Sequence, residues 1–140
     1  MKKLFKEFLE AHNILPYKEN KWEVISIDHS EFSNRVEERK KIRNGLKSIG
    51  CGIYIYTNKN GDVLYVGEGI VRDRLMEHYK KSHEKREKGS PRYYFFHSRK
   101  EEVSVYFREF PNKYERLAVE AMLTTVLEPK YSEWLHQKTK

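Results

Sequence analysis

Residues 51–79, CGIYIYTNKNGDVLYVGEGIVRDRLMEHY, decide the fold of this chain. Two apolar stretches flank Asn60-Gly61, a strong hairpin signal because a type I′ turn requires positive φ at both central positions. A two-residue loop places Lys59 opposite Asp62 and thereby sets the pairing of the two strands. A glycine-containing segment then leads into a helix. The stretch therefore predicts a strand, a tight turn, a second strand and a helix.

This pairing sorts the side chains of the hairpin onto two faces. Because side chains alternate along a strand, Tyr54, Tyr56 and Tyr65 share one face. We expect the opposite face to be the core face, since it carries four aliphatic residues: Ile53, Ile55, Leu64 and Val66. Gly67 lies opposite Tyr54 and leaves open space above it. Three phenols beside a glycine gap can hold a ligand, although an ordinary aromatic cluster across two strands is the commoner arrangement.

The predicted helix after the hairpin presents Arg74 and His78 on one face, because the two residues are four positions apart. Val71 and Leu75 form the adjacent apolar stripe. An arginine beside tyrosines suits a phosphate, because its guanidinium is always charged and can donate two parallel hydrogen bonds. An isolated arginine–histidine pair on a helix is more often part of the solvated surface.

Periodicity and end signals predict the remaining elements. These are a helix over 2–13, a strand over 21–27, a helix through 36–48 with Ser30 as its cap, a strand over 103–110, and a helix over 113–127 with Asn112 as its cap. Pro129 ends the last helix. No linker separates residues 1–50 from the rest. The sequence therefore predicts a single domain over 1–140, with 1–50 as a helical N-terminal extension.

The composition favours a polyanionic partner. The formal net charge is +7 and charged residues make up 35% of the chain, which favours nucleic acid over a membrane because phosphate neutralisation drives such binding. Cys51 is the only cysteine, so no internal disulfide forms and a reducing compartment is expected. No apolar run is long enough to span a bilayer, and acidic residues within 1–13 exclude a signal peptide. We expect a cytoplasmic location in a prokaryotic cell or a phage-infected host.

Residues 82–100 form the most irregular stretch of the sequence. Four consecutive aromatic residues lie between Arg92 and Arg99: Tyr93, Tyr94, Phe95 and Phe96. Aromatic rings interleaved with arginines suit base stacking and phosphate contact. Packing of the same rings into the core beneath a surface loop explains the pattern equally well.

Glu120 lies in the middle of the predicted last helix. Apolar residues surround it on almost every side: Leu117, Ala118, Val119, Ala121, Met122, Leu123, Val126 and Leu127. Such a helix is expected to be buried on most sides, and a buried carboxylate without a partner is costly. Glu120 therefore points into a polar cavity, pairs with a cation or binds a metal. Arg116, four residues earlier, is an alternative partner.

Residues 51–133 together resemble the GIY-YIG nuclease family. The motifs that carry the resemblance are Gly52-Ile53-Tyr54, then Tyr65-Val66-Gly67 after ten intervening residues from Tyr54, Arg74 with His78, the isolated Glu120, and Pro129-Lys130-Tyr131. The first motif alone is weak, whereas the ordered set is specific. The resemblance implies an α+β fold in which a three-stranded antiparallel sheet is flanked by helices.

The resemblance also implies hydrolysis of phosphodiester bonds in DNA with Mg²⁺ or Mn²⁺. Glu120 would be the single protein ligand of the metal, with water and phosphate oxygens completing its coordination. Tyr54 would act as general base toward the attacking water, and Tyr65 would orient the water or the phosphate. Arg74 would stabilise charge on the phosphoryl oxygens, and His78 could accept or relay the tyrosine proton.

Further residues are expected to contact nucleic acid: Gly67, Arg72, Arg92, Tyr93, Arg99 and Lys100. Two residues depart from the family pattern. Ser132 occupies the position of the family's asparagine, which supports the site. Glu68 directly follows the second motif, where it either repels phosphate or holds Arg72 or Arg74.

Two further possibilities concern function and assembly. A catalytically silent nucleic-acid-binding module on the same fold is the alternative function, but the intact tyrosines, Arg74 and Glu120 argue against it. A sequence-specific cutter of both strands needs two active sites. The N-terminal helices are therefore expected to serve either the formation of a homodimer or the wrapping of DNA.

Overall fold

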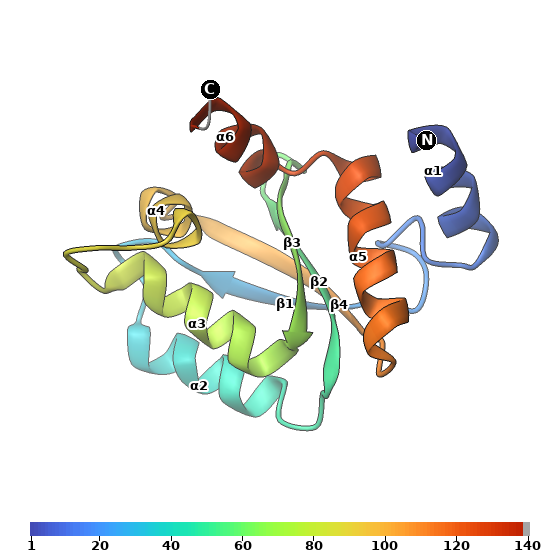
Figure 1. The fold of residues 1–140 in the computed structure, drawn as a ribbon. Coiled ribbons are helices and arrows are strands. Elements are labelled where there is room, and N and C mark those ends of the chain that lie inside the picture. The colour runs from blue at the N-terminus through green and yellow to red at the C-terminus, as the bar shows by residue number, and fades with distance from the viewer. Residues whose placement is uncertain (139–140) are drawn as a thin grey trace.

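A computed structural model describes residues 1–138, and these residues form one four-stranded antiparallel sheet and six helices (Figure 1). In chain order the elements are α1 (Lys2–Ala11), β1 (Glu23–Asp28), α2 (Arg35–Gly45), β2 (Cys51–Asn58), β3 (Val63–Ile70), α3 (Val71–His83), α4 (Pro91–Ser98), β4 (Glu102–Glu109), α5 (Lys113–Leu127) and α6 (Lys130–Lys138). None of the helices within these residues combines the length and apolar character that crossing a bilayer requires.

The sheet has four strands in the order β1-β4-β2-β3, so the expectation of three strands is wrong. The additional strand is β1, which pairs with β4 from Glu23–Phe107 to Asp28–Glu102. A strand over residues 21–27 was predicted from the sequence, but these residues were assigned to a helical N-terminal extension and not to the sheet. Pairing with β1 satisfies the outer edge of β4, which would otherwise expose unpaired backbone groups.

The hairpin between β2 and β3 has the predicted register but a different turn. Tyr56 pairs with Tyr65 and Tyr54 with Gly67, as expected, but the register shifts by one residue after Tyr56. Gly61 has a φ of +83°, whereas Asn60 does not have the positive φ that a type I′ turn requires. The side chain of Asn58 explains the difference, because its Oδ1 accepts hydrogen bonds from the backbone N–H groups of residues 60 and 62.

Both faces of the sheet are buried, so the tyrosine face is a second core and not an open ligand surface. Tyr54, Tyr56 and Tyr65 are each at most 5% exposed, and they pack with residues of α2, α3 and α4. Ile53 and Ile55 pack on the opposite face with residues of α1 and α5. Figure 1 shows these two groups of helices on either side of the sheet. Leu64, expected with the aliphatic residues, instead packs with the tyrosine cluster.

Two helices and one cap differ from the sequence prediction. Within the irregular stretch, α4 begins at Ser90, whose side chain accepts a hydrogen bond from Tyr93 N–H, and Pro91 occupies its first turn. The short helix α6 follows Pro129. The cap of α2 is Asn34, which accepts from Glu37 N–H, and not Ser30.

Helix α5 is buried on one side only, contrary to the expectation from its apolar composition. Arg116, Val119 and Leu123 are its buried residues, spaced three and four positions apart. Leu117 on another side is 39% exposed. Because α5 packs against the sheet and α1, Glu120 lies at the boundary of this contact and is only partly buried.

Candidate active site

The centre of the site is a hydrogen bond between a strand of the hairpin and the helix that follows it. Tyr54 Oη on β2 lies 2.7 Å from His78 Nε2 on α3, and both side chains are almost fully buried. The ring of Tyr65 on β3 stacks against Tyr54 with centroids 6.1 Å apart and meets His78 edge-on at 5.1 Å. The structure thus brings together three of the residues predicted to be catalytic.

Gly67 is needed for the position of Tyr54. A Cβ atom at Gly67 would overlap the phenol ring of Tyr54, which lies directly across the glycine backbone. The space expected above Tyr54 is therefore filled by its own ring. Gly67 acts on the tyrosine through close packing, although it was predicted to contact nucleic acid.

Two arginines counteract the effect of burial on the tyrosines. Burial raises the pKa of Tyr54 well above its usual value, while Arg74 and Arg92 lower it. Burial also raises the pKa of Tyr65, and Arg92 opposes this through its charge and a hydrogen bond. Arg92 comes from the first turn of α4, and was predicted to bind nucleic acid rather than to lie against Tyr65. The positive charges favour the phenolate form of each tyrosine, but burial outweighs them and the pKa of both groups stays raised.

Glu120 on α5 completes the site from the opposite side of β3. Burial is the largest cause that raises the pKa of its carboxyl, and Glu68 adds to it, whereas Arg92, Arg74 and Arg116 lower it. Glu120 itself raises the pKa of Tyr65, so the two groups are close enough to interact electrostatically. Among the described residues the carboxylate takes part in no hydrogen bond or ion pair. It is therefore available for a ligand.

The residues present fit a hard divalent cation held mainly by the substrate. No group of three or more His, Cys, Asp or Glu side chains gathers into a metal cage within residues 1–138. A single available carboxylate suits Mg²⁺, which keeps several waters and is commonly bound through one or two carboxylates plus phosphate oxygens. The raised pKa of Glu120 also fits this role, because a cation would stabilise its ionised form.

The partners of Glu68 and Arg116 exclude two of the alternatives considered from the sequence. Arg116 Nε donates to Glu68 Oε2 at 2.6 Å, and its Nη1 donates to the carbonyls of Phe110 and Pro111. Glu68 therefore holds neither Arg72 nor Arg74, and Arg116 is not the ion-pair partner of Glu120. The ion pair also neutralises an acid that would otherwise repel phosphate.

Arg74 is positioned by the backbone at the end of β3. Gly69 has a φ of +133°, and the side chain of Arg74 packs where a Cβ of this glycine would lie. Arg74 lines an open hollow of about 500 Å³ together with Glu68 and Arg116. Asp73 and Glu77 also line this hollow, so its wall carries charges of both signs.

The other residues predicted to bind nucleic acid make contacts with other side chains and backbone groups of the protein. Arg72 pairs with Asp73 at 3.3 Å, and Lys100 pairs with Glu31 at 3.6 Å. Arg99 lies over the ring of Phe95 at 4.9 Å. Tyr93 is only 3% exposed, and its hydroxyl donates to the carbonyl of Glu84. Its neighbour Tyr94 is the exposed ring of this helix, at 46%. Ser132 lies in the first turn of α6, where its N–H donates to the carbonyl of Pro129.

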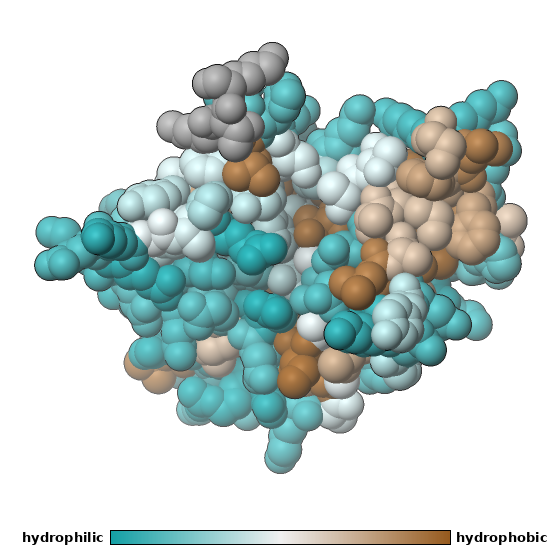
Figure 2. Space-filling model, viewed as in Figure 1, coloured by the Kyte–Doolittle hydropathy of each residue, from teal (hydrophilic) through white to brown (hydrophobic). Residues whose placement is uncertain are grey.

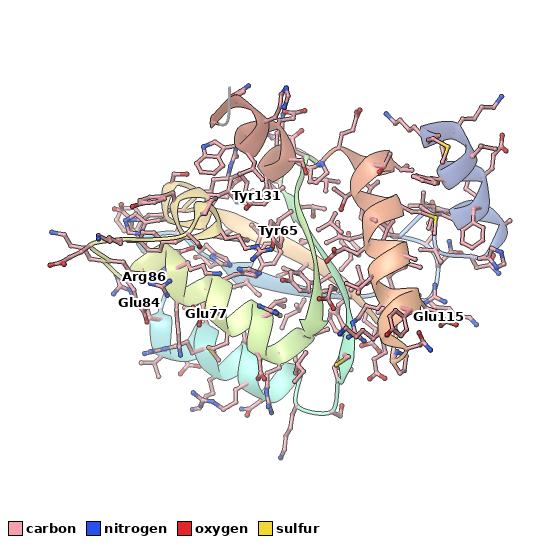
Figure 3. The ribbon with its side chains drawn as sticks, viewed as in Figure 1. Tyr65, Glu77, Glu84, Arg86, Glu115 and Tyr131 are labelled. Atoms are coloured by element: carbon pink, nitrogen blue, oxygen red, sulfur yellow. The ribbon has the colours of Figure 1, made fainter. Side chains whose placement is uncertain are left out.

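Two further residues lie at the site although neither was predicted as a site residue, and Tyr131 was noted only as part of the Pro129-Lys130-Tyr131 motif. Tyr131 on α6 packs against Tyr65 with ring centroids 5.1 Å apart, and Figure 3 shows the two side by side. Lys81 Nζ lies 3.4 Å from His78 Nδ1. The spacing could have revealed Lys81, because Arg74, His78 and Lys81 follow one another at four and three positions along α3.

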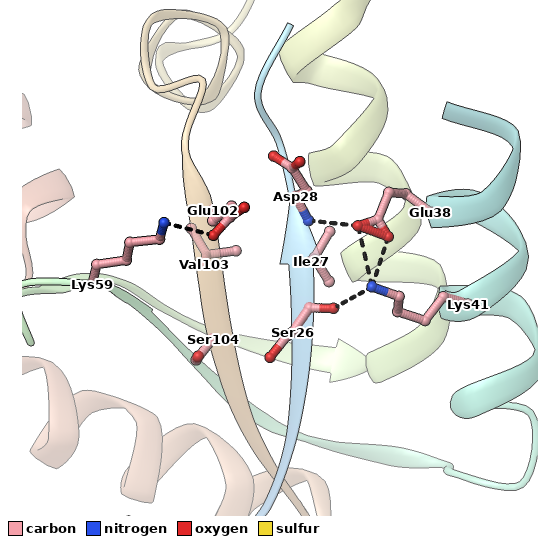
Figure 4. Close-up of a pocket in the computed structure, with 9 residues that line it drawn as sticks. All are labelled: Ser26, Ile27, Asp28, Glu38, Lys41, Lys59, Glu102, Val103 and Ser104. Carbon is pink, nitrogen blue, oxygen red and sulfur yellow. Dashed lines mark hydrogen bonds and ion pairs between the residues drawn. The ribbon is translucent and has the colours of Figure 1, made fainter. Parts of the chain in front are cut away.

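A second hollow, of about 450 Å³, lies away from the tyrosines between β1, β4 and α2 (Figure 4). Its charged groups already have partners: Lys41 pairs with Glu38 at 2.8 Å, and Lys59 pairs with Glu102 at 2.8 Å. Figure 2 shows that the surface over α3 and α4 is mainly hydrophilic, whereas apolar residues gather over α1. The polar surface beside the tyrosines is thus the better match to a nucleic acid.

Solved structures and a family model both resemble this chain. The GIY-YIG N-terminal endonuclease domain of UvrC from Thermotoga maritima, as a point mutant bound to its catalytic divalent cation, is 23% identical with a TM-score of 0.43. The alignment covers 66% of this chain and 94% of that domain. The same domain bound to magnesium is 22% identical, also with a TM-score of 0.43, and the shares covered are 66% and 96%.

The comparison with curated proteins found no match. The model of the GIY-YIG catalytic domain, however, matches residues 50–132, which is more than half of the chain and includes the tyrosines, Arg74, His78 and Glu120. The chain therefore belongs to the GIY-YIG family.

Proposed function

We propose that this protein is a divalent-metal-dependent endonuclease that hydrolyses phosphodiester bonds in DNA. The observation that carries the proposal is the available carboxylate of Glu120 beside a tyrosine pair flanked by arginines. Arg92 interacts electrostatically with Tyr54, Tyr65 and Glu120, which ties the three groups to one site. The net charge of +7 supports a polyanionic substrate.

In this mechanism Tyr54, as phenolate, takes a proton from the attacking water. The water oxygen forms a bond to phosphorus while the bond from phosphorus to the leaving sugar oxygen breaks, and the leaving oxygen takes up a proton from solvent water. Tyr65 orients the water or the scissile phosphate. Arg74 and Arg92 stabilise the negative charge that develops on the phosphoryl oxygens, an effect that is strongest where water is excluded. His78 acts on Tyr54 through the hydrogen bond between them.

Mg²⁺ or Mn²⁺ would be held by Glu120, with phosphate and water oxygens as its other ligands. When bound, such an ion polarises a phosphoryl oxygen and makes a neighbouring water more acidic.

The remaining expectations, on domain organisation, partner and location, follow from the same proposal. We place residues 51–133 as the catalytic core of a single domain over 1–140, with DNA as the partner and the cytoplasm as the location. A homodimer stays a prediction.

A plasmid assay tests the proposal. Supercoiled DNA should be nicked or linearised with Mg²⁺, and addition of EDTA should stop the reaction. Glu120→Ala should abolish cleavage, whereas Glu115→Ala, an exposed position on the same helix, should cut normally. Sequencing the ends then separates specific from non-specific cutting. Salt-dependent DNA binding without any turnover in Mg²⁺ or Mn²⁺ would instead support a silent binding module.

A further inference from the structure

Lys81 is a buried cation without an acidic partner. Its side chain lies on α3 one turn after His78 and is part of a residue only 8% exposed. No ion pair involves it within residues 1–138. Its Nζ instead lies 3.4 Å from Nδ1 of His78, whose Nε2 lies 2.7 Å from Tyr54 Oη. Lys81, His78 and Tyr54 thus form a continuous chain of polar contacts.

The chemistry of the lysine restricts the proton position on the histidine. An ammonium has three N–H donors and no acceptor, whereas a neutral imidazole has one N–H and one lone pair. The Nδ1 atom that faces the ammonium must therefore carry the lone pair. The single ring proton is then on Nε2, and it points at Tyr54 Oη. A neutral amine at Lys81 would accept from Nδ1–H and produce the opposite tautomer.

We propose that Lys81 is a positioning residue that holds His78 in the Nε2–H tautomer, so that His78 donates a hydrogen bond to the oxygen of Tyr54. Donation to a phenolate stabilises it, and the phenolate is the form that can take a proton from water. His78 then acts as a donor to Tyr54 and not as the proton acceptor expected from the sequence. The catalytic part of this inference rests on the proposed nuclease function.

The surroundings hold this arrangement in place. Phe96 stacks on the imidazole with ring centroids 4.3 Å apart and an interplanar angle of 19°, which fixes the plane of the ring. Burial lowers the pKa of His78 well below its usual value, and the nearby cations lower it further, so the ring is neutral. Besides Lys81, the groups that act on His78 are His29, Arg92 and Arg74. Burial is the largest cause that lowers the pKa of Lys81 from its usual value. Glu77 opposes this and favours the ammonium, whereas Arg92, Arg86 and Arg74 lower the pKa further.

Nitrogen NMR tests the tautomer without any need for activity. Long-range proton–nitrogen spectra of the ¹⁵N-labelled protein distinguish protonated from unprotonated ring nitrogens, and the spectrum of His78→Gln identifies the His78 signals. We expect Nε2 protonated and Nδ1 unprotonated in the wild type. Lys81→Met should lose this preference, because Nδ1 no longer faces a donor, whereas Lys81→Arg should keep it. Lys80→Met, at an exposed neighbouring position, is the matched control.

Single-turnover cleavage of a DNA duplex with Mg²⁺ gives the second readout. Lys81→Met should cut about 10- to 100-fold more slowly at neutral pH, which is less than the roughly 10²–10⁴-fold of a full acid–base effect because Tyr54 itself is retained. Its half-saturating DNA concentration should not change, and the rising limb of its pH–rate profile should move to higher pH. Lys81→Arg should restore the rate.

Each outcome decides the inference. Protonated Nδ1 in the wild type, or an unchanged tautomer in Lys81→Met, overturns it whatever the cleavage rates are. If no variant and no wild-type protein cuts DNA, the nuclease proposal fails, while the nitrogen spectra still decide the role of Lys81. A changed tautomer with an unchanged pH–rate profile overturns the catalytic part alone.

Discussion

Tyr54 and Gly67 pack against each other, and the position of the Tyr54 ring depends on the absence of a side chain at Gly67. The phenol ring lies where a side chain at position 67 would be, and its hydroxyl thereby reaches His78. Both residues belong to the motifs that identified the family from the sequence. Their pairing could be predicted from the expected two-residue turn at Asn60-Gly61, but the close contact could not, because it depends on the χ angles of a buried ring.

Gly67→Ala should displace Tyr54 and impair both stability and cleavage. Overpacking of a filled core costs about 1–3 kcal/mol of unfolding free energy, and the displaced phenol loses its hydrogen bond to His78. Urea denaturation and plasmid cleavage measure the two effects. Gly50→Ala is the matched control, because no atom lies within 4 Å of its added Cβ. Equal stability and activity of the two variants would contradict the packing described here.

His29 should make the protein less stable in acid. Burial is the largest cause that lowers the pKa of His29 from 6.5 to about 3, so the unfolded chain takes up this proton first. The free energy of unfolding should therefore fall as pH decreases below about 6.5 and continue to fall toward pH 3, by about 1.4 kcal/mol per unit for one such group. The lowered pKa of His78 acts in the same direction.

Urea midpoints between neutral pH and about pH 5 measure this dependence. His29→Gln should reduce the slope of unfolding free energy against pH by the amount that corresponds to about one proton. The substitution also removes the ring nitrogen that hydrogen-bonds to the hydroxyl of Ser82. An unaltered slope in His29→Gln would show that His29 is not buried in its neutral form.

At the scale of the elements, α3, α4 and α5 bring charged side chains to the hairpin from separate parts of the chain. Helix α3 contributes Arg74, His78 and Lys81, α4 contributes Arg92, and α5 contributes Glu120. The N-terminus of α5 is held by Asn112, whose side chain accepts from the N–H groups of Tyr114 and Glu115 at 3.0 Å. Caps of this kind position a helix without touching the site.

Asn112→Ala should lower the unfolding free energy by about 1 kcal/mol, because two backbone N–H groups lose their acceptor. The cleavage rate of the folded fraction should stay close to that of the wild type, since Glu120 lies two turns away. Thermal or urea denaturation and cleavage assays separate the two effects. Asn44→Ala, an exposed position near the end of α2, is the control and should not destabilise the protein. Equal stability of both variants would argue against the cap.

The sequence predicted most elements, but not all of their partners. The strands of the hairpin, the helix that carries Arg74 and the cap Asn112 follow from local alternation and end signals. The turn differs because the Asn58 side chain competes for backbone N–H groups. The link from Arg116 to Glu68 spans 48 residues, and such long-range pairs leave no local pattern. Lys81 was not predicted as a site residue because only Arg74 and His78 were considered on this face of α3.

At the scale of the whole molecule, residues 1–50 are part of both cores. They supply β1 to the sheet, and their buried apolar side chains lie in the two clusters: Leu9, Ile14, Leu15, Tyr17, Trp22, Ile27, Ile42 and Leu46. Met1, Leu4 and Phe8 form an exposed apolar face of α1, visible in Figure 2 over that helix. The catalytic core proposed for residues 51–133 therefore depends on the preceding segment for its packing.

A fragment of residues 51–140 should not fold on its own. Without residues 1–50 the outer edge of β4 is unpaired and apolar surface on both sheet faces is exposed, which favours aggregation. Circular dichroism and size-exclusion chromatography of the fragment and the full chain measure the difference. A monomeric, cooperatively unfolding fragment with full activity would contradict the single-domain proposal.

The dependence of DNA cleavage on Mg²⁺ concentration, measured for the wild type and for Glu120→Gln, tests the central claim most directly. The substitution keeps the shape of the side chain but removes the charge that would hold the metal. We predict a saturable, Mg²⁺-dependent rate for the wild type and a rate at least about 100-fold lower for Glu120→Gln, since a carboxylate ligand is lost. Equal rates and equal Mg²⁺ dependence in the two proteins would contradict the assignment of Glu120 as the metal ligand.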